Sequence, residues 1–178
     1  PGFESTPLYD FDPAGELLIE NFVVAAVTED SDFTINSGLN DAWFNQATAG
    51  QGFFFNVFPD QGLFFLSWFT FDTERPPEDV TAILGEPGHR WITAQGSFSG
   101  NVATLDATLT SGGVFDSPLP GVENGDYGSV TVTFEGCNAA TVAYDFPDPG
   151  VSGTVDVERV VPDNVALCEA LQEGSEAR

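Results

Sequence analysis

The sequence predicts an all-β fold, an antiparallel β-barrel or β-sandwich of about eight to ten strands followed by one short C-terminal helix. Three observations support this prediction. Short apolar runs recur along the chain at short intervals. Gly, Pro, Asn and Asp separate these runs, as is typical of turns between strands. Most runs alternate apolar and polar residues, which is the pattern of a strand with one buried face.

The alternation is clearest in four segments, residues 103–110, 130–134, 142–146 and 154–158. In the first of them, Ala103, Leu105 and Ala107 share one face, and Thr104 and Asp106 lie on the other. The connections between these segments are short. Short connections favour antiparallel neighbours in a meander.

The segment Asp41–Phe71 breaks this alternation. It predicts two strands joined by a turn at residues 59–62, and both strands are apolar on both faces. In the second strand, Phe65 and Phe69 lie on one side, and Phe64 and Trp68 lie on the other. One face packs inside the domain, so we expect something else to cover the second face.

A helix is predicted near the C-terminus. Asp163 is a suitable N-cap, Gly174 a suitable stop, and Cys168 falls on the inward face between them. The chain has two cysteines, and in an exported domain Cys137 and Cys168 are expected to form a disulfide. Two buried free thiols are the alternative.

Residues 1–36 are predicted to be an N-terminal segment or arm with one strand, and residues 37–178 a β-domain that ends in the helix. The strand candidate is Leu17–Val27, which either completes the sheet of its own domain or pairs with another subunit. In the second case the assembly strand would include Leu17, Leu18, Ile19, Phe22, Val23 and Val24.

The charge is strongly unbalanced, with 28 acidic residues against four basic ones and a net charge of −24. Such a chain repels nucleic acid and anionic membrane surfaces. No apolar run approaches the length that a membrane-spanning helix needs. We interpret the acidic residues as the solvated shell of a folded extracellular protein, with calcium-dependent assembly as the alternative.

The chain begins at Pro1 without methionine and has no apolar signal core. We therefore expect a mature form, secreted after signal removal and located outside the cell.

Three blocks of the sequence form a recognisable set of motifs, from Trp43 to Phe53, from Trp68 to Asp72, and again at Trp91 and Gly96. They match the pattern G-x-W-[YF]-[ND]-x-A-x-x-G-x-G-F, followed by W-[YF]-T-[YF]-D. This set resembles a widespread, uncharacterised family of exported bacterial β-domain proteins. Asp41-Ala42 departs from the pattern, which has Gly at its first position. The resemblance covers about residues 37–172 and implies an exported β-domain, sometimes a repeat or an appendage, but no activity.

No catalytic motif stands out, so we predict that the chain is not an enzyme. His89 is the only histidine, and Gly96-Ser97-Phe98-Ser99-Gly100 has phenylalanine where a nucleophile would stand. We predict no cofactor, with calcium as an alternative. The weak candidates for calcium are two acidic turns, at Asp10 with Asp12 and at Asp145 with Asp148.

The three tryptophans, Trp43, Trp68 and Trp91, are either core residues or a ligand surface for a carbohydrate. We also expect an ion pair between the neighbours Glu158 and Arg159.

The sequence leaves three hypotheses for the function. The leading hypothesis is a non-catalytic secreted protein that assembles with copies of itself at the cell surface, as a filament or a surface layer. It rests on the doubly apolar hairpin and the extra N-terminal segment. The alternative is an extracellular binding module for a carbohydrate or an apolar ligand, and a carboxylate-dependent hydrolase is the least favoured.

Overall fold

The computed structural model describes residues 10–11, 17–18, 33–85 and 87–176. The chain divides into two compact units, Pro1–Asp30 and Ser31–Arg178, which are described separately. The division falls a few residues before the predicted boundary at residues 36/37, because Ile35 is buried in the core of the second unit.

The described part of the first unit is one short antiparallel pair. Strand β1 (Asp10–Phe11) pairs with β2 (Leu17–Leu18) within the same chain. The rest of the predicted strand Leu17–Val27 lies outside the described residues, including Ile19, Phe22, Val23 and Val24.

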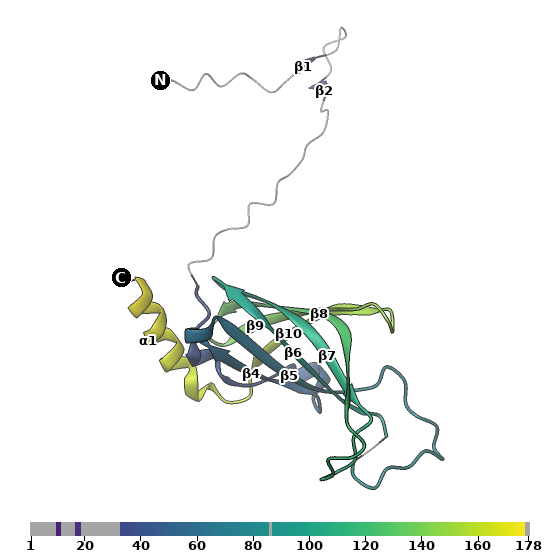
Figure 1. The fold of residues 1–178 in the computed structure, drawn as a ribbon. Coiled ribbons are helices and arrows are strands. Elements are labelled where there is room, and N and C mark those ends of the chain that lie inside the picture. Colours follow the sequence, from purple (N-terminus) through teal and green to yellow (C-terminus); the bar gives the residue numbers. More distant parts are fainter. Residues whose placement is uncertain (1–9, 12–16, 19–32, 86, 177–178) are drawn as a thin grey trace. The chain divides into compact units, whose positions relative to one another are not determined.

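The second unit is a closed antiparallel barrel of eight strands, which confirms the predicted fold class and settles it as a barrel (Figure 1). The strands are β3 (Asp41–Phe44), β4 (Gly52–Phe58), β5 (Leu63–Phe71), β6 (His89–Ser99), β7 (Val102–Ser111), β8 (Glu123–Gly136), β9 (Ala139–Phe146) and β10 (Val151–Arg159). They follow one another around the barrel, and β10 closes it by pairing with β3.

The two ends of the barrel differ (Figure 1). The helix end carries α1 (Val165–Glu176), the one α-helix among the described residues, and the short 3-10 helix η1 (Ser37–Leu39). The loop end carries the two long connections, residues 72–88 and 112–122, together with the turn at residues 147–150. No helix in the described part of the chain is long and apolar enough to cross a membrane.

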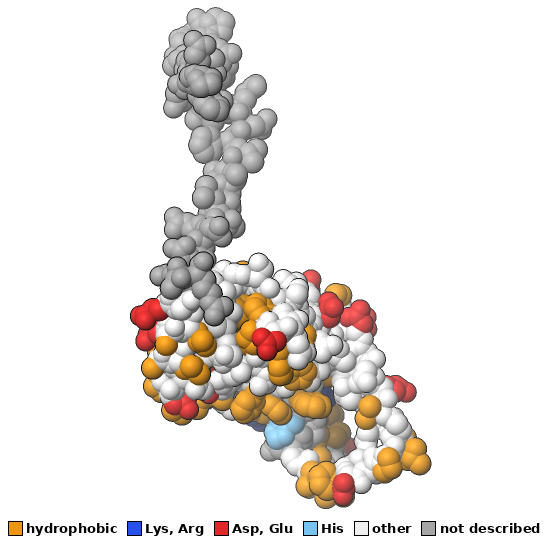
Figure 2. Space-filling view, turned by 60° about the vertical axis from the view of Figure 1, so that its left-hand side comes forward, with side chains coloured by type: hydrophobic (Ala, Val, Ile, Leu, Met, Phe, Trp, Pro, Cys, Tyr) orange, Lys and Arg blue, Asp and Glu red, His pale blue; other side chains and the backbone are white. Residues whose placement is uncertain are grey.

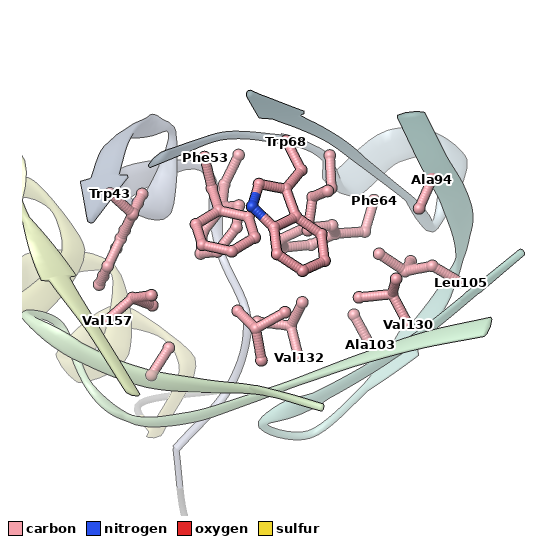
Figure 3. Packing of buried hydrophobic residues seen from close by; sticks show 14 of the residues in the cluster. Trp43, Phe53, Phe64, Trp68, Ala94, Ala103, Leu105, Val130, Val132 and Val157 are labelled. Atoms are coloured by element: carbon pink, nitrogen blue, oxygen red, sulfur yellow. The ribbon is translucent and has the colours of Figure 1, made fainter. Parts of the chain in front are cut away.

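Aromatic rings fill the interior of the barrel (Figure 3). Trp43 and Phe55 stack at 5.3 Å between ring centroids, and Phe134 meets both of them edge to face. Phe53 stacks on Trp68 at 4.9 Å. Each of these side chains is at most 5% exposed, and burial of one large apolar side chain stabilises the fold by roughly 1.5–3 kcal/mol.

A disulfide and an arginine close the helix end. Cys137, in the turn between β8 and β9, is bonded to Cys168 of α1, as predicted, with a Cα–Cα distance of 5.8 Å. Gly38 of η1 lies against the backbone of Cys168 so closely that a Cβ would come within 2.5 Å of it. The helix therefore seals this end of the barrel.

Arg159 ties the sealed end together. Its side chain donates to Asp41 Oδ2 at 2.7 Å, to the Gly38 carbonyl at 2.6 Å and to the Cys137 carbonyl at 2.6 Å. Its guanidinium lies 4.7 Å from the ring centroid of Trp43. The predicted pair with Glu158 is wrong because neighbours on a strand point to opposite faces, and Arg159 is the inward one.

Helix α1 also departs from its predicted bounds. Residues 162–164 form a 3-10 helix, η4, and the α-helix runs through Gly174 to Glu176. Gly174 is not among the glycines with positive φ, so it lacks the left-handed conformation by which glycine ends a helix.

Candidate functional site

The loop end of the barrel holds a cavity of ≈ 480 Å³. Its walls are the loop-end segments of β5 to β10, together with residues that follow β3. Most of the side chains that line it are apolar or aromatic: Trp68, Phe71, Ile92, Leu109, Tyr127, Tyr144, Phe146, Pro149, Val151 and Val155. Polar lining comes from Thr48, Gln51, Thr70, Asp72, Thr73, Arg90 and Thr154. The cavity is thus an apolar pocket with a few polar groups.

Four aromatic rings form a continuous wall in this cavity. Tyr127 of β8 packs on Phe146 of β9 at 4.8 Å, and Phe146 stacks with Tyr144 at 5.3 Å. Tyr144 meets Trp68 of β5 edge to face at 5.2 Å. The two tyrosines add hydroxyl groups that can donate or accept a hydrogen bond.

A β-bulge in β8 positions Tyr127. On β8, Gly128 pairs with Ala107 and Asp126 pairs with Thr108, so Tyr127 between them is the extra residue. A bulge turns a side chain toward a direction that the regular strand would not allow. Gly128 has φ +126°, and a Cβ there would meet the carbonyl oxygen of Asp145 at 2.1 Å. Only glycine fits the second position of this bulge.

A second glycine makes room for Tyr144. Gly153 of β10 is the register partner of Tyr144, and a Cβ on Gly153 would lie 2.7 Å from the Tyr144 hydroxyl oxygen. The missing side chain lets the tyrosine ring lie along the wall of the barrel. The shape of the cavity therefore depends on Gly128 and Gly153.

Trp68 has an unusual polar atom. Its indole Nε1 is buried and has no hydrogen-bond partner in the described part of the chain. The corresponding atom of Trp43 donates to the Leu39 carbonyl at 3.2 Å. A buried donor without a partner costs roughly 1–3 kcal/mol, so such groups are rare and often lie at functional positions.

The charged side chains at the cavity are paired with each other. Arg90 donates to Asp72 Oδ2 at 2.6 Å, and both side chains are 40% exposed. Arg90 also donates to the carbonyls of Pro87 and His89, and the backbone N–H of Asp72 donates to the carbonyl of Gly88. These contacts close the base of the loop of residues 72–88. In the part of the lining that the structure describes, both charged side chains are paired.

The structure separates the three tryptophans that the sequence suggested as one ligand surface. Trp43 is fully buried at the helix end, and Trp91 is 47% exposed on the outside of β6. Only Trp68 lines the cavity. Of the two alternatives, the core assignment is confirmed for Trp43 and Trp68, which point inward. Trp91 points outward from β6, so the three tryptophans do not share one surface.

The weak metal candidates gain no support. Asp145 and Asp148 are exposed, and the described residues hold no group of three or more His, Cys, Asp or Glu that could bind a metal ion. Asp12 and the side chain of Asp10 lie outside the described residues. Calcium binding thus stays a prediction.

His89 is the first residue of β6 and lies beside the ring of Phe71, at 5.5 Å between centroids. It does not line the barrel cavity.

Comparison of the chain with protein-family models, with curated proteins and with solved structures finds no match. The resemblance to exported β-domain proteins therefore stays an expectation.

Proposed function

We propose that the barrel is a non-catalytic binding protein for a small, uncharged, largely apolar molecule that enters the cavity at the loop end. The cavity carries this proposal. Its volume of ≈ 480 Å³ falls within the range of about 300–1,000 Å³ that is typical of small-molecule sites. An aromatic wall with a few polar groups is also typical of such sites.

The polar groups favour an uncharged ligand. Arg90 and Asp72 neutralise each other, so neither is free to hold an opposite charge on a ligand. The net charge of −24 opposes the entry of an anion. Among the described residues, Asp72 is the only carboxylate in the lining, which also favours a binding role over acid–base catalysis.

We further propose that the protein works outside the bacterial cell. The Cys137–Cys168 disulfide supports this because disulfides persist in oxidising compartments.

Titration with N-phenyl-1-naphthylamine, a neutral apolar fluorescent probe, tests the proposed binding. Val155→Phe should narrow the cavity, because Val155 lines it and is partly buried. The matched control is Val160→Phe, since Val160 is 54% exposed and outside the lining. We expect saturable binding to the parent chain, about tenfold weaker binding to Val155→Phe and unchanged binding to the control.

An anionic naphthalene sulfonate of similar size should bind more weakly than the neutral probe at low ionic strength, because the net charge repels it. Equal binding of the neutral probe to all three proteins would contradict the assignment of the cavity.

A further inference from the structure

Exposed aromatic rings lie on the outside of the barrel, away from the cavity. Phe54 and Phe58 of β4, Phe69 of β5 and Trp91 of β6 are 42–51% exposed. We call these four residues the outer aromatic face. Figure 2 shows hydrophobic side chains gathered on the visible surface of the molecule. None of the four lines the barrel cavity, so this face is independent of the proposed ligand site.

Three of these rings form one continuous row across three strands. Phe69 is the register partner of Trp91, and their ring centroids are 6.3 Å apart. Phe54 meets Phe69 edge to face at 5.9 Å, with an angle of 87° between the ring planes. A sugar stacks on flat, exposed ring faces, and rings at right angles do not offer a common plane. The row is better suited to packing against the side chains of another protein.

The outward positions of the three strands that form this face hold no acid, although Asp60 lies in the turn after Phe58 and Asp106 of β7 pairs with Gln95. These outward positions belong to β4, to β5 up to Phe69 and to β6 from Trp91 onward. They hold only Gly, Phe, Asn, Leu, Ser, Trp, Thr and Gln, although the chain has 28 acidic residues. Acids occupy exposed positions on the remaining strands, at Asp106, Glu135, Asp145, Asp156 and Glu158.

This distribution points to a partner that is itself strongly acidic. Contact between two chains of net charge −24 is opposed by repulsion that acts over a Debye length of about 10 Å at 0.1 M salt. Repulsion is least where both surfaces lack acids. A second copy of this chain offers the same uncharged face.

The exposed apolar area of the outer aromatic face is large enough to contribute to an interface. A Phe or Trp side chain buries about 150–250 Å², so four half-exposed rings offer about 400 Å². A standard interface needs about 800 Å² from each partner, and the uncharged residues around the rings supply further area. Soluble monomers seldom expose larger apolar patches without a function.

We propose that the outer aromatic face binds the same face of a second copy, related by a two-fold axis. Such an isologous contact closes at two copies, so a filament or a surface layer would need an additional contact surface.

Sedimentation velocity of the full chain over a wide concentration range tests this proposal, at about 0.01 M and about 0.3 M NaCl, where the Debye length differs severalfold. We expect a monomer–dimer equilibrium that tightens at the higher salt concentration. Phe69→Ser should weaken it at least about tenfold, since both copies lose the ring. The matched control is Phe115→Ser, because Phe115 is 81% exposed in the loop between β7 and β8, and it should leave the equilibrium unchanged.

Acrylamide quenching gives a second readout that needs no variant. Trp43 and Trp68 are buried, so Trp91 is the tryptophan that acrylamide reaches in the monomer. Its quenching should fall as the dimer forms. A chain that stays monomeric in all conditions, or a dimer that Phe69→Ser leaves intact, overturns the proposal. So does a monomer whose Trp91 is protected until residues 1–30 are removed, since the chain itself would then cover the face.

Discussion

Trp68 and Tyr144 meet edge to face at 5.2 Å between ring centroids, although they come from β5 and β9, which lie on opposite sides of the eight-strand barrel. Both residues line the cavity, and Trp68 also stacks on Phe53 in the core. The contact therefore bridges the barrel where the packed core ends and the cavity begins. Substitutions on the cavity side of this boundary should mainly affect ligand binding, and those on the core side should mainly affect stability.

Gly153→Ala should weaken binding of the neutral probe by about tenfold. Its effect on the free energy of unfolding should be much smaller than the loss of binding free energy that this represents. The added Cβ would lie 2.7 Å from the Tyr144 hydroxyl oxygen, and the tyrosine can yield only by moving its ring. Gly136→Ala is the control, because a Cβ there meets nothing within 4 Å. Probe titration and urea unfolding of both variants test this, and unchanged affinity in Gly153→Ala would show that Tyr144 does not shape the site.

The two buried tryptophans should differ when each is replaced by phenylalanine. Trp43→Phe removes the hydrogen bond to the Leu39 carbonyl and part of the contact with Arg159. Trp68→Phe removes an N–H that has no partner among the described residues. We expect Trp43→Phe to cost about 1–3 kcal/mol more free energy of unfolding than Trp68→Phe. Equal costs in urea unfolding would mean that the Trp68 N–H is satisfied in solution.

Arg159→Met should lower the free energy of unfolding by about 3–5 kcal/mol, because it leaves the largely buried Asp41 without its partner. Arg90→Met removes the other ion pair in the described residues, but both of its side chains are 40% exposed. That change should cost only about 0–1 kcal/mol. Denaturant titrations compare the two variants, and a small effect of Arg159→Met would contradict its role in holding the helix end.

Cys137 and Cys168 should resist alkylation under denaturing conditions without a reductant and react fully after reduction. Their sequence separation of 31 residues gives about 3–4 kcal/mol of stabilisation in the chain-entropy model. Intact mass measures the labelling, and urea unfolding of the double Cys→Ser variant measures the stabilisation. Two labelled thiols before reduction would contradict the disulfide.

The fold class was predictable because it rests on local patterns. The alternation at Ala103, Leu105 and Ala107 matches three buried positions of β7. Barrel closure was not predictable, because it depends on the pairing of β10 with β3, more than a hundred residues apart. One half of the prediction for the doubly apolar hairpin is confirmed, since Phe64 and Trp68 are buried. Phe69 on the other face is 46% exposed, so the expected second cover stays a prediction.

The candidate site was predictable only in part. Tyr144 and Phe146 share an inward alternation with Val142. The pattern does not tell where along the barrel axis side chains fill the interior and where they line a cavity. Tyr127 was missed because a bulge places it, and the only local signal in the sequence is the glycine that follows it, Gly128, whose φ is positive in the structure. The role of Arg159 was missed because its partner Asp41 is 118 residues away.

The most direct test of ligand binding uses the indole N–H signals of the three tryptophans in a ¹H–¹⁵N correlation spectrum, each assigned with a Trp→Phe variant. Trp68 lines the cavity, Trp43 is buried at the helix end and Trp91 lies outside the barrel. During titration with N-phenyl-1-naphthylamine, the account predicts a saturable shift of the Trp68 signal, while the signals of Trp43 and Trp91 stay in place. A probe that binds but shifts only Trp91, or that leaves Trp68 unmoved at saturation, would contradict the assignment of the cavity as the binding site.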